Sequence, residues 1–232
     1  MIVDKILSFL DKYIHKKRII KFLEDKFIVT VIDIGSHKGE FINSVLNISS
    51  VSNVISFEPQ KNIFDLLQKS FSNNTKINLN NSAVAEKSGK KIMQINKLSD
   101  TSTLNEVDNS SLFFKFKSFL LHEKNSVISE EVVSTTTIDS FFKNKKLCKN
   151  VLLKIDTEGY EFNVLLGAKK TIQRIKYVLI ENQFSKMYKN VNFEDCHEFL
   201  TQHQFKLTKK FKFPTFHYED RFYINTNVVI KE

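Results

Sequence analysis

The chain has 232 residues, of which 41% are hydrophobic and 26% are charged, and it carries a formal net charge of +9. This length and composition are typical of one globular α/β domain. The two cysteines, Cys148 and Cys196, are far apart and lack metal-ligand spacing, which excludes a disulfide scaffold and favours a reducing compartment. No apolar run is long enough to span a membrane, and the first residues lack a signal-peptide core, so we expect a cytoplasmic protein.

Residues 1–24 form a predicted amphipathic helix, in which Ile6, Leu10 and Ile14 share one face. We expect this helical extension to pack on the domain that spans residues 25–232. Docking of the helix to a membrane surface or to a partner protein is the alternative.

Strand and helix patterns alternate through the first part of the domain. An apolar strand at 28–34 and a helix at 38–47 are followed by a strand at 54–58, a helix at 61–72 and a strand at 76–85. This β-α-β-α-β order predicts a parallel sheet with right-handed crossovers.

A less regular segment, residues 97–130, follows a predicted strand at 90–96. It is rich in Ser, Asn, Asp and Lys around the apolar patch Leu112–Phe116, and we interpret it as an insertion or lid over a ligand site. A surface helix without a role in binding is the alternative. The remaining predicted elements are strands at 131–137, 150–156 and 177–181, helices at 138–142, 159–175 and 193–203, and an antiparallel hairpin of 204–213 with 221–230 around Pro214.

The first chemical motif, Asp33-x-Gly35-x-x-x-Gly39, stands at the end of the first strand. It is neither the G-x-G-x-x-G of dinucleotide-binding enzymes nor a Walker loop. A glycine turn without a phosphate cradle, preceded by a carboxylate, suits a ligand with a cationic amino acid group and an adenosine, which is S-adenosylmethionine. Asp33 is placed to hold the ammonium, and the two glycines let the backbone approach closely. An ordinary strand end is the alternative.

Glu58 ends the second predicted strand, nineteen residues after Gly39. This spacing is typical of an acidic residue that binds both ribose hydroxyls, and Phe57 and Pro59 beside it are placed to line the adenine. The third predicted strand ends in Asn80-Asn81-Ser82-Ala83-Val84, where a polar group can meet the exocyclic amine of adenine. A simple Asn-Ser turn is the alternative there.

The second motif is Lys154-Ile155-Asp156-Thr157-Glu158-Gly159-Tyr160-Glu161. A buried strand delivers Asp156 to its carboxyl end, where ligands bind in open α/β sheets. Three carboxylates within six residues repel one another unless a cation or donor is near, and Lys154, a network of substrate hydroxyls or a divalent ion would serve. Alternatively, Glu158 and Glu161 only start a helix and interact with its dipole.

Together these motifs resemble the FkbM-type S-adenosylmethionine-dependent methyltransferases over about residues 28–183. The resemblance implies a class I, Rossmann-like methyltransferase fold, an α/β fold with a mostly parallel seven-stranded sheet, helices on both faces and a C-terminal antiparallel hairpin. It also implies O-methylation, often of sugars in bacterial surface glycans or of natural products. The segments that carry it are Asp33–Phe41, Phe57–Pro59, Asn81–Ala85 with Gly89, Thr137–Asp139, Leu153–Glu161, Val164–Ala168 and Val178–Glu181.

The resemblance and the motifs together define a predicted site for S-adenosylmethionine and its reaction. We expect Asp156 to act as the base and Glu158 to orient the acceptor or to replace Asp156 as base, with His37 less favoured. We expect no metal, and a Mg²⁺ ion held by Asp156, Glu158 and Glu181 is the alternative. A Ser-rich loop of the family falls at Ser99, Ser102 and Thr103. The predicted cofactor-binding residues are Asp33, Gly35, Ser36, Gly39, Glu58, Ser82 and Ala83.

The expected acceptor is a small molecule or a glycan. Most of the positive charge is scattered Lys, typical of a solvated surface, although an anionic glycan, a membrane or a nucleic acid would also be attracted. With only Pro59 and Pro214, the chain lacks the Asn/Asp-Pro-Pro-aromatic and Pro-Cys motifs of nucleic-acid methyltransferases. Two alternative functions stay open: a nucleic-acid methyltransferase, and a scaffold or glycan-binding protein that keeps the fold without turnover. The sequence carries no signal for the oligomeric state.

Overall fold

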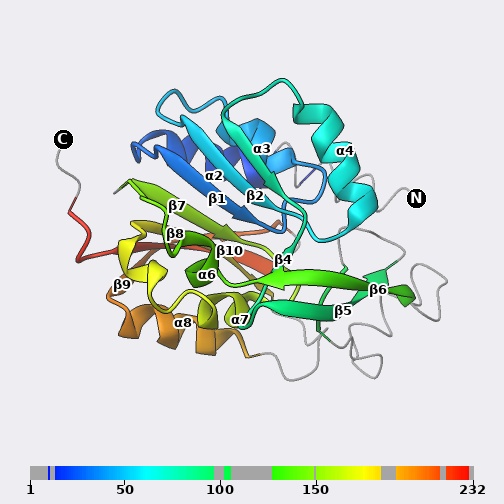
Figure 1. The fold of residues 1–232 in the computed structure, drawn as a ribbon. Helices are drawn as coiled ribbons and strands as arrows, with labels where there is room; N and C mark the ends of the chain where they lie inside the picture. Colours follow the sequence, from blue (N-terminus) through cyan, green and yellow to red (C-terminus); the bar gives the residue numbers. More distant parts are fainter. Residues whose placement is uncertain are drawn as a thin grey trace.

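A seven-stranded sheet forms the centre of the computed structural model, which describes residues 10, 14–96, 102–105, 127–148, 150–183, 192–214 and 218–229 (Figure 1). Its strand order is β3-β2-β1-β7-β8-β10-β9, and β10 runs antiparallel to both of its neighbours while the other pairings are parallel. The predicted fold class, with its C-terminal antiparallel pair, is confirmed. The strands are β1 (Thr30–Ile34), β2 (Asn53–Phe57), β3 (Ile77–Asn80), β7 (Val151–Ile155), β8 (Tyr177–Gln183), β9 (Phe205–Lys212) and β10 (Tyr218–Asn225).

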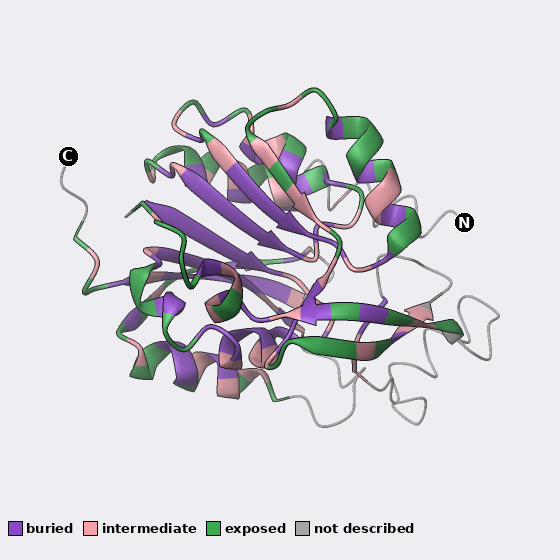
Figure 2. Ribbon diagram, viewed as in Figure 1, coloured by how far each residue is buried: buried purple, intermediate pink, exposed green. Residues whose placement is uncertain are grey.

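Helices cover both faces of this sheet, because the central strands are apolar on both sides. Within β1, Val31 packs toward one face, and Ile32 and Ile34 pack toward the other. Figure 2 shows the central strands as almost continuously buried. The first face carries α2 (Lys16–Glu24), α3 (Glu40–Val45) and α4 (Lys61–Phe71); the second carries α6 (Ile138–Phe142), α7 (Glu161–Leu166) and α8 (Phe193–Gln202).

A second sheet, which the sequence did not predict, has the order β4-β6-β5. The prediction of one strand over 76–85 is wrong, since β3 ends at Asn80 and the chain turns before β4 (Ala83–Val84). The amide of Asn81 stabilises this turn by donating to the carbonyls of Glu58 and Pro59. The other strands of this sheet are β5 (Gly89–Asn96) and β6 (Val127–Thr136).

The predicted insertion at 97–130 overlaps β6, which already begins at Val127. Its residues 97–101 and 106–126, with the patch Leu112–Phe116 and Ser99, lie outside the described residues.

The prediction of one long helix over 159–175 is also wrong. Helix α7 ends before Gly167, and a 3-10 helix, η3 (Thr171–Arg174), follows after a turn. A Cβ on Gly167 would lie 2.2 Å from the Ala85 carbonyl oxygen, so the chain passes directly against the end of β4. The carboxylate of Asp139 then accepts a 2.7 Å hydrogen bond from the Thr171 amide, which starts the new helical turn.

Helix α2 joins the domain through Ile19 and Leu23, which are buried against the sheet. The predicted apolar face is wrong at Ile14, whose exposed fraction is 39%; Ile6 lies outside the described residues. Just before α2, His15 is buried, and its Nε2 lies 2.6 Å from Oδ2 of Asp220 in β10. Within the described residues, no helix combines the length and the apolar character needed to cross a membrane.

Candidate active site

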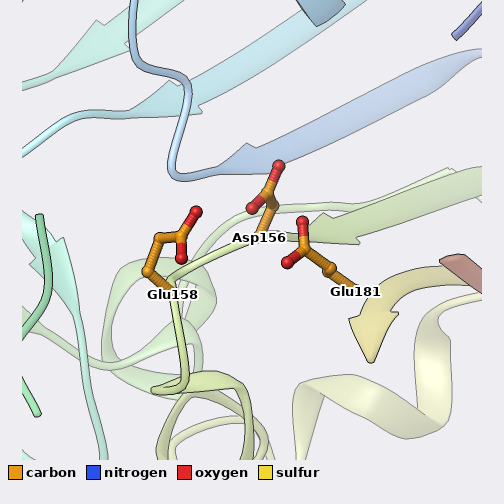
Figure 3. A group of neighbouring side chains, drawn as sticks. All are labelled: Asp156, Glu158 and Glu181. Carbon is orange, nitrogen blue, oxygen red and sulfur yellow. The ribbon is translucent and has the colours of Figure 1, made fainter. Parts of the chain in front are cut away.

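Three carboxylates meet at the carboxyl ends of β7 and β8. Ile155 of β7 pairs with Ile180 of β8, so Asp156 and Glu181 follow side by side at the same edge of the sheet. Glu158 joins them from the turn after β7, and the three side chains point toward one another (Figure 3). One oxygen of each carboxylate lies within 4.8 Å of one oxygen of the other two. We call this group the carboxylate cluster.

Lys154 connects the carboxylate cluster to the end of β1. Its Nζ lies 3.0 Å from Oδ2 of Asp156 and 3.4 Å from Oδ1 of Asp33, which Lys154 faces across the β1–β7 pair. Burial alone would raise the pKa of Asp156, but the charge and hydrogen bond of Lys154 outweigh burial, so the pKa of Asp156 is lowered. Asp156 therefore stays ionised at neutral pH.

Asp33 is completely buried, and burial raises its pKa even though Lys154 opposes the rise. The main group that opposes the rise is the ammonium of Lys154, whose Nζ lies 3.4 Å from Oδ1 of Asp33. The cation that Asp33 meets in this structure is thus an ammonium of the protein itself. The direct contact with a cofactor ammonium stays a prediction.

Glu181 is the residue whose importance the sequence analysis understated. Burial, followed by the charges of Asp156 and Glu158, raises the pKa of Glu181 well above its ordinary value. Glu181 therefore holds a proton more readily than an ordinary carboxylate, and it shares a hydrogen bond with Asp156. The sequence feature that could have identified Glu181 is its position at the end of a predicted buried strand. Asp156 has the same position on the neighbouring strand.

Gln183 completes the cluster from the same strand. Its Nε2 lies 2.8 Å from Oε2 of Glu158 and 2.8 Å from Oε1 of Glu181, so one amide donates to two carboxylates. Three carboxylate oxygens could bind Mg²⁺. Here, however, Lys154 and Gln183 already supply a charge and donors, so the cluster does not require a metal. That the protein uses none stays a prediction.

The glycine turn after β1 lies directly against this cluster. Gly35 has a φ of +82°, and a Cβ there would stand 1.9 Å from the carbonyl oxygen of Asp156. Only glycine allows this approach. Gly39 has a φ of +81°, but its missing side chain faces Leu67 and Phe71 of α4, so its space serves the packing of α3 on α4.

Of the other predicted cofactor residues, Ser36 supports the turn from within, whereas Ser82 and Ala83 lie elsewhere. The buried hydroxyl of Ser36 lies 2.5 Å from that of Ser56 and donates to the Asp33 carbonyl, so it faces the protein interior. Ser82 is half-buried, whereas Ala83 is buried with Met93 and Val133 in the core of the small sheet. The structure thus keeps Ser36 near the turn and directs Ala83 into another core.

Glu58 is held by two backbone amides at the turn after β1. Its Oε1 accepts from the Gln60 amide at 2.8 Å and its Oε2 from the His37 amide at 2.9 Å, so the carboxylate is fixed at the turn after β1. Each oxygen keeps a second lone pair for another donor. Burial raises the pKa of Glu58 to about 7, although both amides oppose the rise. These features fit the ribose of an adenosyl cofactor.

The sheet order, with antiparallel β10 inserted between β8 and β9, and the glycine turn beside the carboxylates define a Rossmann-like methyltransferase fold. The chain belongs to the FkbM methyltransferase family, because the family described as "Methyltransferase FkbM domain" matches residues 33–207. No curated protein matches the sequence.

Two solved structures show the same fold at low identity. The methyltransferase FkbM from Methylobacillus flagellatus KT has a TM-score of 0.55 and 12% identity, over 85% of this chain and 44% of its own. This chain therefore spans less than half of that protein. TrmK from M. capricolum, solved with S-adenosyl-homocysteine, has a TM-score of 0.51 and 11% identity, over 92% of this chain and 71% of its own.

Proposed function

We propose that this chain transfers the methyl group of S-adenosylmethionine to a hydroxyl group of a sugar in a surface glycan or of a related small molecule. The observation that carries the proposal is the carboxylate cluster beside the turn of Gly35, because a methyl donor and a proton acceptor must meet within one site. Membership of the FkbM family supports methyl transfer. TrmK, solved with the demethylated cofactor, supports the choice of cofactor.

The residues that would hold the cofactor are Glu58, for the ribose, and the turn at Gly35, for the amino acid part. S-adenosylmethionine, when bound, supplies an activated methyl carbon on a sulfonium. The protein then has two tasks: to align the acceptor oxygen with that carbon and to take the proton of the hydroxyl. Alignment alone is worth about 7–11 kcal/mol in well-oriented reactions.

The proton of the acceptor passes to the pair of Asp156 and Glu181. The two carboxylates share a hydrogen bond, so they titrate as a unit. Lys154 keeps Asp156 in the ionised form, so Asp156 is our preferred base. Glu158, which accepts a hydrogen bond from Gln183, orients the acceptor hydroxyl.

The charge of the site favours a hydroxyl acceptor over a nucleic acid. Asp156, Glu158 and Glu181 face one another with Lys154 as the nearby cation. A phosphate backbone brought next to this cluster would be repelled. A nucleic-acid methyltransferase is therefore the second candidate function. A protein that keeps the fold without turnover is the third.

The experiment combines calorimetry with an acceptor screen. Purified protein should bind S-adenosyl-homocysteine, and labelled S-adenosylmethionine should methylate members of a panel of sugars and oligosaccharides. Absence of heat for both the cofactor and its product would contradict the proposal at its first step. Transfer to RNA but to no sugar would replace it with the nucleic-acid alternative.

A further inference from the structure

The turn at residues 156–159 is fixed by a carboxylate that the mechanism does not use. Glu161, the first residue of α7, has an exposed fraction of 1%. Its Oε1 accepts hydrogen bonds from the Thr157 amide at 2.9 Å, the Thr157 hydroxyl at 3.1 Å and the Gly159 amide at 3.2 Å. Glu161 thus accepts three hydrogen bonds from the preceding turn. An interaction with the helix dipole alone would not require these contacts.

The opposite side of the same turn is held by residues 102–105. The hydroxyl of Thr103 donates to the carbonyl of Glu158 at 2.7 Å, and the amide of Asn105 donates to the carbonyl of Gly159. Amides of the turn therefore meet Glu161, and carbonyls of the turn meet Thr103 and Asn105. The peptide group between Glu158 and Gly159 is thus held at both its N–H and its carbonyl, and the peptide groups before Thr157 and after Gly159 carry one hydrogen bond each.

Glu158 needs this support because its backbone is unfavourable. Its φ of +54° lies in the left-handed region, which costs a non-glycine residue about 1–2 kcal/mol. This conformation accompanies a side chain that faces Asp156 and Glu181 (Figure 3). Without Glu161, an ordinary backbone conformation would become accessible and the carboxylate of Glu158 would leave the cluster.

We infer that Glu161 is a positioning residue, which holds the left-handed turn so that Glu158 faces Asp156 and Glu181. The inference deepens the proposed function and rests on it only for the value of Glu158 in the reaction. The geometry itself can be tested without any acceptor. The reporter is the side-chain amide of Gln183, whose Nε2 donates to Glu158 at 2.8 Å.

The experiment compares side-chain amide resonances of Gln183 in ¹H–¹⁵N spectra at constant pH. Glu158→Gln defines the displacement that follows when the charged partner is lost. Glu161→Ala should displace the Gln183 resonance in the same way, whereas Glu161→Gln, which keeps an acceptor oxygen, should leave it near the wild-type position. Glu198→Ala on the exposed side of α8 is the matched control.

The double variant separates positioning from a general loss of structure. If Glu161 acts through Glu158, Glu161→Ala should cause no further displacement of the Gln183 resonance in the Glu158→Gln background. A resonance that stays at the wild-type position in Glu161→Ala, or an equal displacement in both backgrounds, overturns the inference. Thr103→Val removes a single donor to the turn and gives the same comparison if Glu161→Ala does not fold.

Calorimetry with S-adenosyl-homocysteine on the same proteins keeps the two proposals apart. We expect Glu161→Ala to bind it as tightly as wild type, because Glu161 does not face the turn at Gly35. Failure of wild type to bind contradicts the proposed function and leaves the result for Gln183 standing.

Discussion

Glu58 gives a prediction about pH that needs no knowledge of the acceptor. Its pKa is raised to about 7, mainly by burial. The ionised carboxylate is the stronger acceptor for ribose hydroxyls, so binding of the cofactor favours loss of the proton. The affinity for the cofactor should therefore be highest well above pH 7, and it should fall as the pH drops through 7.

The size of the effect follows from the fraction of Glu58 that is ionised. With a pKa of about 7, roughly one tenth is ionised at pH 6 and roughly nine tenths at pH 8, which corresponds to about tenfold in affinity or about 1.4 kcal/mol. Hydrogen bonds to a charged group contribute about 1.5–3 kcal/mol. Glu58→Gln should therefore weaken binding about ten- to a hundredfold at pH 8 and remove the pH dependence.

The assay is calorimetric titration with S-adenosyl-homocysteine at pH 6, 7 and 8. Glu40→Gln is the matched control, since Glu40 is the first residue of α3, directly after the same turn, and its side chain is 49% exposed. Glu161, whose pKa is also raised to about 7, titrates in wild type and in both variants and so does not affect the comparison. An affinity of wild type that stays constant from pH 6 to pH 8, or a Glu58→Gln variant that retains the slope, would refute the reasoning.

Four further predictions concern the site and its supports. Asp156→Asn should lower methyl transfer to a hydroxyl acceptor by about 10²–10⁴-fold while S-adenosyl-homocysteine still binds, because the base is lost and the turn is kept; a variant with most of its rate would show that another group is the base. His15→Ala should lower the free energy of unfolding in urea by about 3–5 kcal/mol, because Asp220 loses its buried partner, and a loss below 1 kcal/mol would contradict this. Gly35→Ala should prevent folding or cost more than about 3 kcal/mol, whereas Gly89→Ala, with no atom within 4 Å of its Cβ, should cost only about 1–2 kcal/mol of backbone strain; equal melting temperatures would be inconsistent with the contact. Mg²⁺ should give no binding heat in the micromolar range, and tight binding would favour the metal alternative.

The central sheet could be predicted because each of its strands has a local signature. The apolar runs before Gly35 and Asp156 read as buried parallel strands, and the family resemblance extends this order to the terminal hairpin. The break after Asn80 could not be predicted, because it depends on contacts with Glu58 and Pro59, which are distant in sequence. The end of α7 at Gly167 likewise depends on the neighbouring Ala85.

The sequence predicts which residues gather at the candidate site better than it predicts the contacts between their side chains. Asp156, Glu158 and Glu58 all lie at the predicted sheet edge, but the sequence does not show which carboxylates are paired. The lowered pKa of Asp156 and the raised pKa of Glu181 both depend on distances across β7 and β8. The buried hydroxyl of Ser36 shows the same limit, since adjacency to a motif does not reveal the direction of a side chain.

The charge of the carboxylate cluster is only partly neutralised, which is what the proposed binding of a cationic cofactor would require. Lys154 balances part of the charge of Asp33 and Asp156, and the raised pKa of Glu181 reduces the negative charge further, yet Glu158 adds to it. Burial of ions costs several kcal/mol unless partners offset it, so this cluster lowers the stability of the protein when no further cation is present. A cationic sulfur nearby would relieve that cost. If the proposed reaction takes place here, the carboxylates would take up the proton of the acceptor hydroxyl while the cofactor gives up its positive charge, so the total charge of the site would not change.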